Sequence, residues 1–143
     1  MKLVIQRVKS ASVSVSGETV GKIDKGLFIL VGVGIGDILE QAAEFAIKVS
    51  KLRIMSDEND KMNLSIKDVS GEVLAVSQFT LYADTKTGNR PSFIKAEEPT
   101  KARQIYEYFV ETLRKDGISV ETGRFGEYMI IETILDGPVT ITI

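Results

Sequence analysis

The sequence predicts a single α+β domain with two main helices and a mainly antiparallel or mixed, barrel-like β-sheet. Apolar runs of strand length outnumber the helical segments, and several of them are joined by short turns. Only two segments carry apolar residues at helical spacing. The 143 residues suffice for one buried core, and no linker, repeat or low-complexity segment divides residues 1–143.

The first third of the chain is expected to form three strands. Residues 2–16 have strand character, and Ser16-Gly17-Glu18 predicts a turn into a short strand at residues 19–23. A second turn leads into the apolar run 27–31, which is typical of a central strand. The glycines of residues 32–36 do not have the spacing of a dinucleotide-binding loop, and no phosphate-binding lysine follows them. We therefore interpret this segment as a strand end that leads into a helix.

Two helices are predicted by their apolar periodicity. Asp37 and Glu40 form a capping-box pattern, and the helix that they open is expected to run to about Leu52. The second helix begins near Pro99 and ends before Gly117, because glycine suits the first position after a helix. Its apolar stripe consists of Ala102, Ile105, Tyr106, Phe109 and Leu113.

The last quarter of the chain returns to strands. Residues 118–121 and 128–135 have strand character, and residues 139–143 alternate valine or isoleucine with threonine. Asp136-Gly137-Pro138 is expected to break the strand between the last two segments. A Gly–Pro step in such a turn is a candidate for a cis peptide bond, and a plain hairpin turn is the alternative.

The absence of histidine and cysteine limits the chemistry more than any other feature of the composition. Catalytic triads with histidine, cysteine nucleophiles and zinc sites built on these residues are excluded. We predict no metal site and no cofactor, and the acidic loop 56–60 lacks the glycine and the distal glutamate of an EF-hand. Catalysis would need shifted carboxylates or lysines, hydroxyls, backbone donors, a bound cation or groups of the substrate itself.

A cytoplasmic location without membrane contact is expected. Residues 1–10 lack the apolar core of a signal peptide, and no stretch approaches 18 consecutive apolar residues. The net charge of −2 does not favour a general nucleic-acid binder, although it permits a local basic patch. The candidates for such a patch are Lys86, Arg90 and Lys95, with Lys51 and Arg53 as others, and an ordinary solvated surface charge is the alternative for each of them.

Ser77–Asp84 is the most unusual stretch of the sequence. The segment Glu72-Val73-Leu74-Ala75-Val76, which is apolar after its first residue, predicts a strand buried on both faces, and we expect this strand to continue through the stretch. Gln78 and Thr80 would then lie on one face with Tyr82. Burying such groups without partners costs about 1–3 kcal/mol each, so they need hydrogen-bond partners from the protein or from a ligand.

Two short segments together resemble the paired signatures of the D-aminoacyl-tRNA deacylases, also called D-tyrosyl-tRNA deacylases. They are Ser77-Gln78-Phe79-Thr80-Leu81 and Gly137-Pro138-Val139-Thr140. The similarity extends over essentially the whole chain. Further matching segments are Gln6-Arg7-Val8, Lys61-Met62-Asn63-Leu64-Ser65, Arg90-Pro91-Ser92-Phe93, and Gly123 with Phe125-Gly126 and Met129.

The resemblance implies a homodimer that hydrolyses the ester between a D-amino acid and the 3′-terminal adenosine of tRNA, with active sites at the subunit interface. It implies that Gly137 and Pro138, joined by a cis bond, reach into the partner's pocket and exclude L-amino acids. The residues that it places along the adenosine and ester pocket are Ser77, Gln78, Phe79 and Thr80. Those that it places near the pocket are Arg7, Phe125 and Met129.

Such a reaction is consistent with the absence of histidine, because the substrate is an activated ester with a hydroxyl group beside it. Backbone N–H groups near Phe79 and Thr80 are expected to stabilise the oxyanion. We expect the Thr80 hydroxyl, the ribose 2′-hydroxyl of the terminal adenosine, or both to orient the attacking water. A covalent route through Thr80 would need a base, and the sequence shows none.

Two positions depart from the family pattern. Leu135 stands where asparagine is usual, and Glu127 where alanine is usual. These two departures leave open whether the site prefers esters of D-amino acids or of glycine mischarged on tRNA. The alternative function is a non-catalytic dimeric module that binds an RNA end or a small ligand in the same pocket.

Overall fold

The computed structural model describes residues 1–143 and confirms an α+β fold with two main helices. The helices are α1 (Leu39–Lys51) and α2 (Pro99–Lys115), and η1 (Phe79–Tyr82) is a short 3-10 helix. The strands are β1 (Lys2–Val15), β2 (Glu18–Ile23), β3 (Gly26–Gly32), β4 (Met55–Ser56), β5 (Met62–Leu64), β6 (Glu72–Ser77), β7 (Ser119–Thr122) and β8 (Ile130–Thr142). Neither helix is long and apolar enough to cross a membrane.

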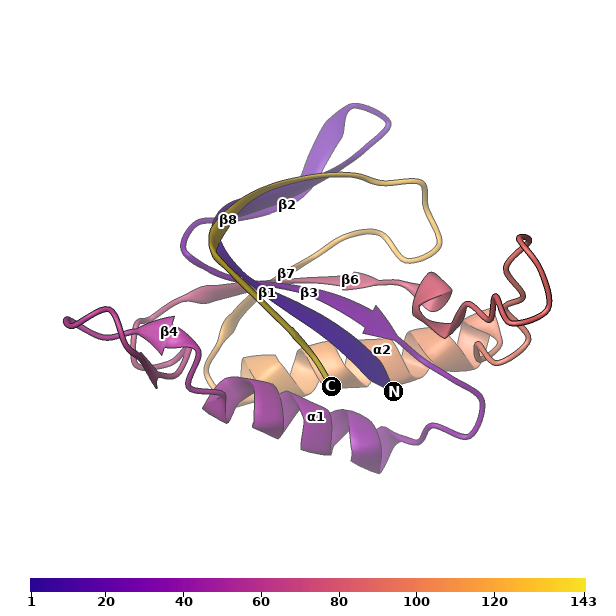
Figure 1. The fold of residues 1–143 in the computed structure, drawn as a ribbon, viewed down its shortest axis with the longest axis horizontal. Helices are drawn as coiled ribbons and strands as arrows, with labels where there is room; N and C mark the ends of the chain where they lie inside the picture. Colours follow the sequence, from indigo (N-terminus) through magenta and orange to yellow (C-terminus); the bar gives the residue numbers. More distant parts are fainter.

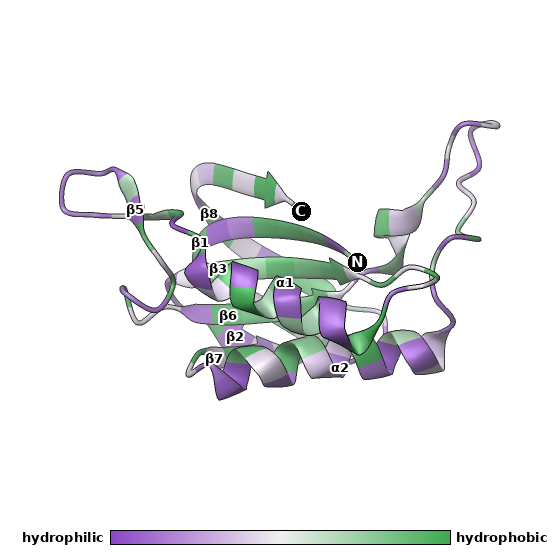
Figure 2. Cartoon of the chain, turned by 90° about the horizontal axis from the view of Figure 1, so that it is seen from below, coloured by the Kyte–Doolittle hydropathy of each residue, from purple (hydrophilic) through white to green (hydrophobic).

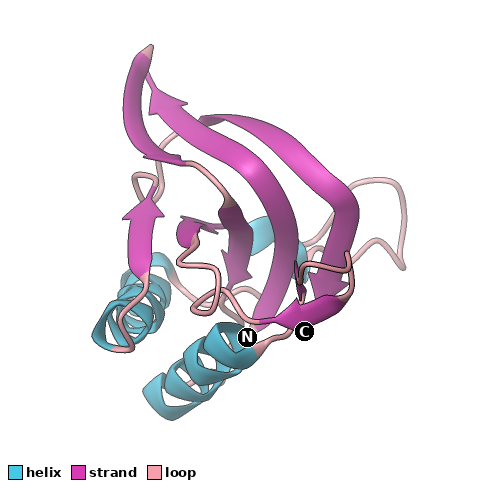
Figure 3. Ribbon diagram, turned by 90° about the vertical axis from the view of Figure 1, so that its left-hand side faces the viewer, coloured by secondary structure: helices cyan, strands magenta, loops and turns pink.

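β1 organises the main sheet, whose order is β2-β1-β3-β6-β7, with β8 paired to β1. β1 pairs antiparallel with β2, β3 and β8, whereas β3–β6 and β6–β7 are parallel, so the sheet is mixed. The sheet curls until β2 approaches β7, and a Cβ atom on Gly21 would lie 2.7 Å from the carbonyl oxygen of Thr122. Figure 3 shows the resulting barrel-like form. The predicted sheet type and barrel-like shape are therefore both observed.

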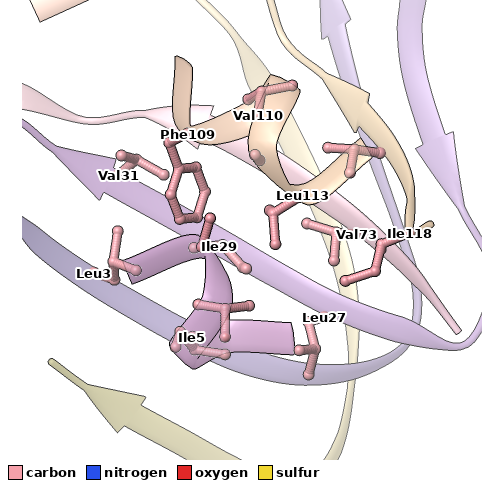
Figure 4. Packing of buried hydrophobic residues seen from close by; sticks show 14 of the residues in the cluster. Leu3, Ile5, Leu27, Ile29, Val31, Val73, Phe109, Val110, Leu113 and Ile118 are labelled. Atoms are coloured by element: carbon pink, nitrogen blue, oxygen red, sulfur yellow. The ribbon is translucent and has the colours of Figure 1, made fainter. Parts of the chain in front are cut away.

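The strand alternation divides the buried residues into two clusters. On β3, Leu27, Ile29 and Val31 face the helices, while Phe28 faces the inside of the curled sheet. Figure 4 shows side chains of β1, β3 and β6 packed against Phe109, Val110 and Leu113 of α2. Helices α1 and α2 lie side by side on one face of the sheet (Figure 1), and hydrophobic and hydrophilic residues alternate along both (Figure 2). The buried hydrophobic residues of both helices belong to the cluster that they form with the sheet.

Helix α2 follows the prediction closely. The side chain of Glu98 caps its beginning by accepting hydrogen bonds from the backbone N–H groups of Thr100 and Lys101. At its end Gly117 has a φ of +86°, and Ile118 donates to the carbonyl of Leu113. These two features form a Schellman motif, the type of helix ending that Gly117 predicted.

The predicted capping box of α1 is wrong. The N-cap is Ile38, whose backbone N–H donates to Oε1 of Gln41 at 3.1 Å. Asp37 instead accepts from the backbone N–H of Gly34 at 2.7 Å and from the amino group of Met1 at 2.5 Å. Asp37 is therefore occupied in closing the loop after β3 and cannot cap the helix.

The predicted break at Asp136-Gly137-Pro138 is also wrong, because β8 runs without interruption from Ile130 to Thr142. Its pairing with β1 changes register between Gln6 and Val8, and again between Val8 and Ser10. These register changes accommodate the Gly–Pro step inside the strand. Proline lacks a single backbone N–H donor, so the pairing with β1 continues on either side of it. The Gly137–Pro138 peptide bond is cis.

Candidate functional site

A cleft of about 530 Å³ opens where the parallel strands β3 and β6 end. Its walls come from those strand ends, from η1, from the first turns of α2 and from the loop between β7 and β8. Twelve of its eighteen lining residues are hydrophobic, which suits the apolar part of a small ligand more than a bare polyanion. The volume lies in the range of small-molecule sites.

The predicted strand Ser77–Asp84 ends at its first residue and turns into η1. Ser77 makes the last β6 pair with Val31, and β7 pairs with β6 only as far as Ala75. The N–H of Gln78 makes one more bond to β3, to the carbonyl of Val31 at 2.8 Å, and the hydrogen bonds after it close locally. The N–H of Leu81 donates to the carbonyl of Gln78, as in a helical turn. The expected two-faced strand is therefore wrong, and Phe79 and Thr80 are exposed.

Five of the predicted site residues line this cleft. They are Ser77, Gln78, Phe79, Phe125 and Met129. Thr80 lies just outside the lining, and its Oγ1 accepts a hydrogen bond from Nε2 of Gln78. The first N–H groups of a helical turn have no partners within that turn, so the N-terminus of η1 offers backbone donors at the cleft.

Aromatic side chains that were not predicted as site residues complete the cleft. Phe93 meets Phe79 edge to face, with ring centroids 5.0 Å apart, and Tyr106 lies 6.0 Å from Phe125. The buried Tyr106 hydroxyl donates to the carbonyl of Ala75 at 2.9 Å, and burial raises the pKa of this phenol. Tyr106 was expected only as a core residue, because a helical stripe does not distinguish a core wall from a cleft wall.

Only two charged residues line the cleft, and both are acidic. Glu97 forms an ion pair with Lys101 at 2.7 Å, and this hydrogen bond lowers the pKa of the Glu97 carboxyl. Glu127 is exposed, and its backbone N–H donates to the carbonyl of Arg124 at 3.2 Å. The cleft therefore contains one carboxylate that Lys101 engages and one at its open side. No group of three or more acidic, histidine or cysteine residues is placed to hold a metal ion.

Arg7, Gly137 and Pro138 form a second group away from the cleft. Arg7 is 8% exposed and donates to the carbonyls of Asp136 and Ile54, at 3.1 and 3.0 Å, and to Ser56 Oγ at 3.2 Å. Its guanidinium also pairs with the carboxylate of Asp136 at 3.1 Å. Arg7 thus holds the backbone immediately before Gly137.

The two groups lie toward opposite ends of β3. Arg7 is opposite Leu27, whereas Ser77 is opposite Val31, four residues or about 13 Å farther along the strand. The predicted site residues therefore do not meet in one pocket of a single chain.

The three main candidates for the basic patch lie in different surroundings. Lys95 pairs with Asp84 at 2.8 Å, and this interaction lowers the pKa of the Asp84 carboxyl. Lys86 and Arg90 lie on the exposed loop that projects from the body after η1 (Figure 1). Of these three residues, none lines the cleft.

Comparisons with known proteins agree with this architecture. The family model described as D-Tyr-tRNA(Tyr) deacylase matches residues 4–143. A protein of Bacillus licheniformis named D-aminoacyl-tRNA deacylase is 58% identical over 140 residues, which cover 98% of this chain and 95% of that protein.

Two solved structures share the fold. One, titled c-Myc DNA Unwinding Element Binding Protein, is 38% identical with a TM-score of 0.93 and covers 100% of this chain and 97% of that one. The other, titled as a probable eukaryotic D-amino acid tRNA deacylase, has a TM-score of 0.83 at 14% identity, covers 99% and 97% of the two chains, and supports the fold alone. The family match and the Bacillus relative confirm the resemblance, and the chain belongs to the D-Tyr-tRNA(Tyr) deacylase family.

Proposed function

We propose that this protein hydrolyses the ester bond of D-aminoacyl-tRNA and releases free D-amino acid and tRNA. Support comes from the family membership and from a cleft whose size and apolar lining suit a nucleoside ester. The observation that carries the proposal is the placement of Ser77, Gln78 and Phe79 in that cleft, beside the free backbone donors of η1. Glycine mischarged on tRNA is proposed as a second substrate, and a tRNA substrate implies a cytoplasmic location.

The complete site is proposed to form between two subunits. Gly137 and Pro138 are exposed, do not line the cleft of their own chain, and would reach the cleft of a partner chain. They follow Asp136, which Arg7 holds about 13 Å along β3 from the position of Ser77. β8 pairs with β1 on one edge only, and it exposes Ile130, Ile134 and Leu135. A long edge strand with exposed apolar side chains is a common pairing surface between chains. In the dimer, the Gly137–Pro138 backbone would leave room for a D side chain and block an L side chain.

The proposed reaction uses positioning and groups of the substrate. A water oxygen attacks the ester carbonyl carbon, the N–H groups at the start of η1 hold the negative oxygen that develops, and the ribose oxygen leaves with a proton. The ribose 2′-hydroxyl and the Thr80 hydroxyl orient the water. Gln78 supports this geometry, because its amide donates to Thr80 Oγ1 and leaves the hydroxyl hydrogen free to point elsewhere.

The test of this function is hydrolysis of D- and L-tyrosyl-tRNA by the purified protein, with and without a chelator. We expect release of D-tyrosine at least about 100-fold faster than release of L-tyrosine, because a steric block acts on the L side chain alone. The chelator should have no effect. Comparable rates for both isomers would contradict the steric model. Binding without any hydrolysis would favour the alternative, a non-catalytic dimeric module for RNA ends or small ligands.

Replacing Thr80 by alanine is expected to lower kcat for D-tyrosyl-tRNA roughly 10–100-fold, since losing a hydrogen bond to a developing charge costs about 1.5–3 kcal/mol. Thr80→Ser keeps the hydroxyl and should retain most of the activity. Thr80 is exposed, so equal melting temperatures should show that both variants fold. Near-normal turnover by Thr80→Ala would leave the hydroxyl without a catalytic role.

A further inference from the structure

Tyr128 is the most exposed large hydrophobic residue of the chain, at 86%, and it also lines the cleft. An exposed tyrosine at the mouth of a cleft offers a flat apolar surface to whatever extends out of the cleft. Neither the capture of the ester nor its hydrolysis, as proposed above, uses this residue. We propose that Tyr128 stacks on the base of the nucleotide that precedes the terminal adenosine. This inference rests on the proposed function and extends it to a second nucleotide.

The backbone around Tyr128 is anchored on both sides. Phe125 packs against Tyr106, and the backbone N–H of Glu127 closes a turn on Arg124 at 3.2 Å. On the other side Met129 packs against the cluster inside the curled sheet. A ring that projects from an anchored loop loses little backbone entropy when a ligand stacks on it.

The cleft dimensions determine which part of an RNA reaches Tyr128. A volume of about 530 Å³ suits one nucleoside ester, so the preceding nucleotide must lie at the mouth. Phe79, also at the cleft and 57% exposed, gives the mouth a second aromatic surface. Stacking on an aromatic side chain contributes about 1–3 kcal/mol per base and tolerates every base, which suits an enzyme that acts on many tRNAs.

The test is a calorimetric measurement of the Kd of adenosine and of the dinucleotide CpA, the end of every mature tRNA. Tyr128→Ala should weaken CpA binding about 5–100-fold and leave adenosine binding unchanged, because only the added nucleotide reaches the ring. Tyr128→Trp keeps an aromatic ring at this position and should bind CpA about as tightly as the unaltered protein does. These ligands carry no ester, so a failure to hydrolyse D-aminoacyl-tRNA would count against the proposed function and not against stacking.

Tyr108→Ala is the matched control, since Tyr108 is 39% exposed on α2 but does not line the cleft, and this variant should bind both ligands as the unaltered protein does. An unchanged Kd of CpA in Tyr128→Ala would overturn the proposal. An equal loss for adenosine would overturn it too, because it would place the ring in the nucleoside pocket. Dissociation of a dimer by Tyr128→Ala would instead assign the ring to the subunit interface and would also overturn it.

Discussion

A D-tyrosyl-tRNA whose terminal adenosine lacks the 2′-hydroxyl is expected to be hydrolysed roughly 10²–10⁴-fold more slowly than the native substrate, the range typical of a missing acid–base group. The physical reason is the scarcity of protein groups that could take a proton in the cleft. Glu97 is ion-paired with Lys101 and has a lowered carboxyl pKa, and the phenol of Tyr106 is buried with a raised pKa. Single-turnover release of labelled D-tyrosine from 3′-linked esters, with and without the 2′-hydroxyl, measures the effect.

Glu127→Gln provides the control for a protein base. Glu127 is the remaining carboxylate of the cleft and is exposed at its open side, so we expect its replacement to change the rate by less than about threefold. Equal rates for the deoxy and native substrates would contradict substrate assistance. A large loss in Glu127→Gln would assign the base to that carboxylate.

A heterodimer that combines two differently damaged subunits is expected to recover about half of the wild-type activity, although each homodimer is inactive. One subunit carries Ala96→Trp, which fills the cleft that Ala96 lines. The other carries Gly137→Ala, whose Cβ would lie 2.7 Å from the Val139 nitrogen at a φ of +134°, where side chains are strained. If each site combines one chain's cleft with the other chain's Gly137–Pro138, one of the two sites in the heterodimer is intact.

The heterodimer can be isolated by co-expression of the two subunits with two different affinity tags. The control is a heterodimer in which one subunit carries both substitutions and the other carries none. Each of its sites then contains one damaged part, so it should be inactive under the same model. Recovery of half the activity in this control, and none in the first heterodimer, would show that each site is complete within one chain.

Strand alternation and the end of α2 were predictable from sequence because local rules decide them. Val31 and Leu27 share a face with Ile29 because side chains alternate, and the structure places all three against the helices. Gly117 ends α2 because a left-handed residue is needed there. Both patterns depend on neighbours a few residues away, so one sequence suffices to read them.

The errors occurred where distant segments decide the local structure. Ser77 ends β6 because β7 pairs only as far as Ala75 and β3 supplies one last acceptor, the Val31 carbonyl, and the residues after Ser77 carry no signal of that loss. Asp37 fails to cap α1 because the Met1 amino group and the Gly34 N–H engage its carboxylate. Likewise Gly137–Pro138 stays within β8 because β1 continues to pair on both sides of it.

The candidate site shows the same division. By resemblance, the sequence alone identified Gln78 and Phe79 with Phe125 and Met129, and all four line the cleft. It could not show that Tyr106 and Tyr128 share that cleft, because their contribution depends on where α2 and the β7–β8 loop meet the ends of the parallel strands.

By itself, the sequence determined the fold class, the two helices, the family and the exclusion of histidine and cysteine chemistry. Only the tertiary structure decided that the signature after Ser77 is a helical turn with free backbone donors, and that Arg7 holds the Gly137 backbone away from the cleft of its own chain. The reason is physical. Composition and periodicity report local preferences, whereas the end of a strand and the walls of a cleft depend on which distant segments are present to pair and pack.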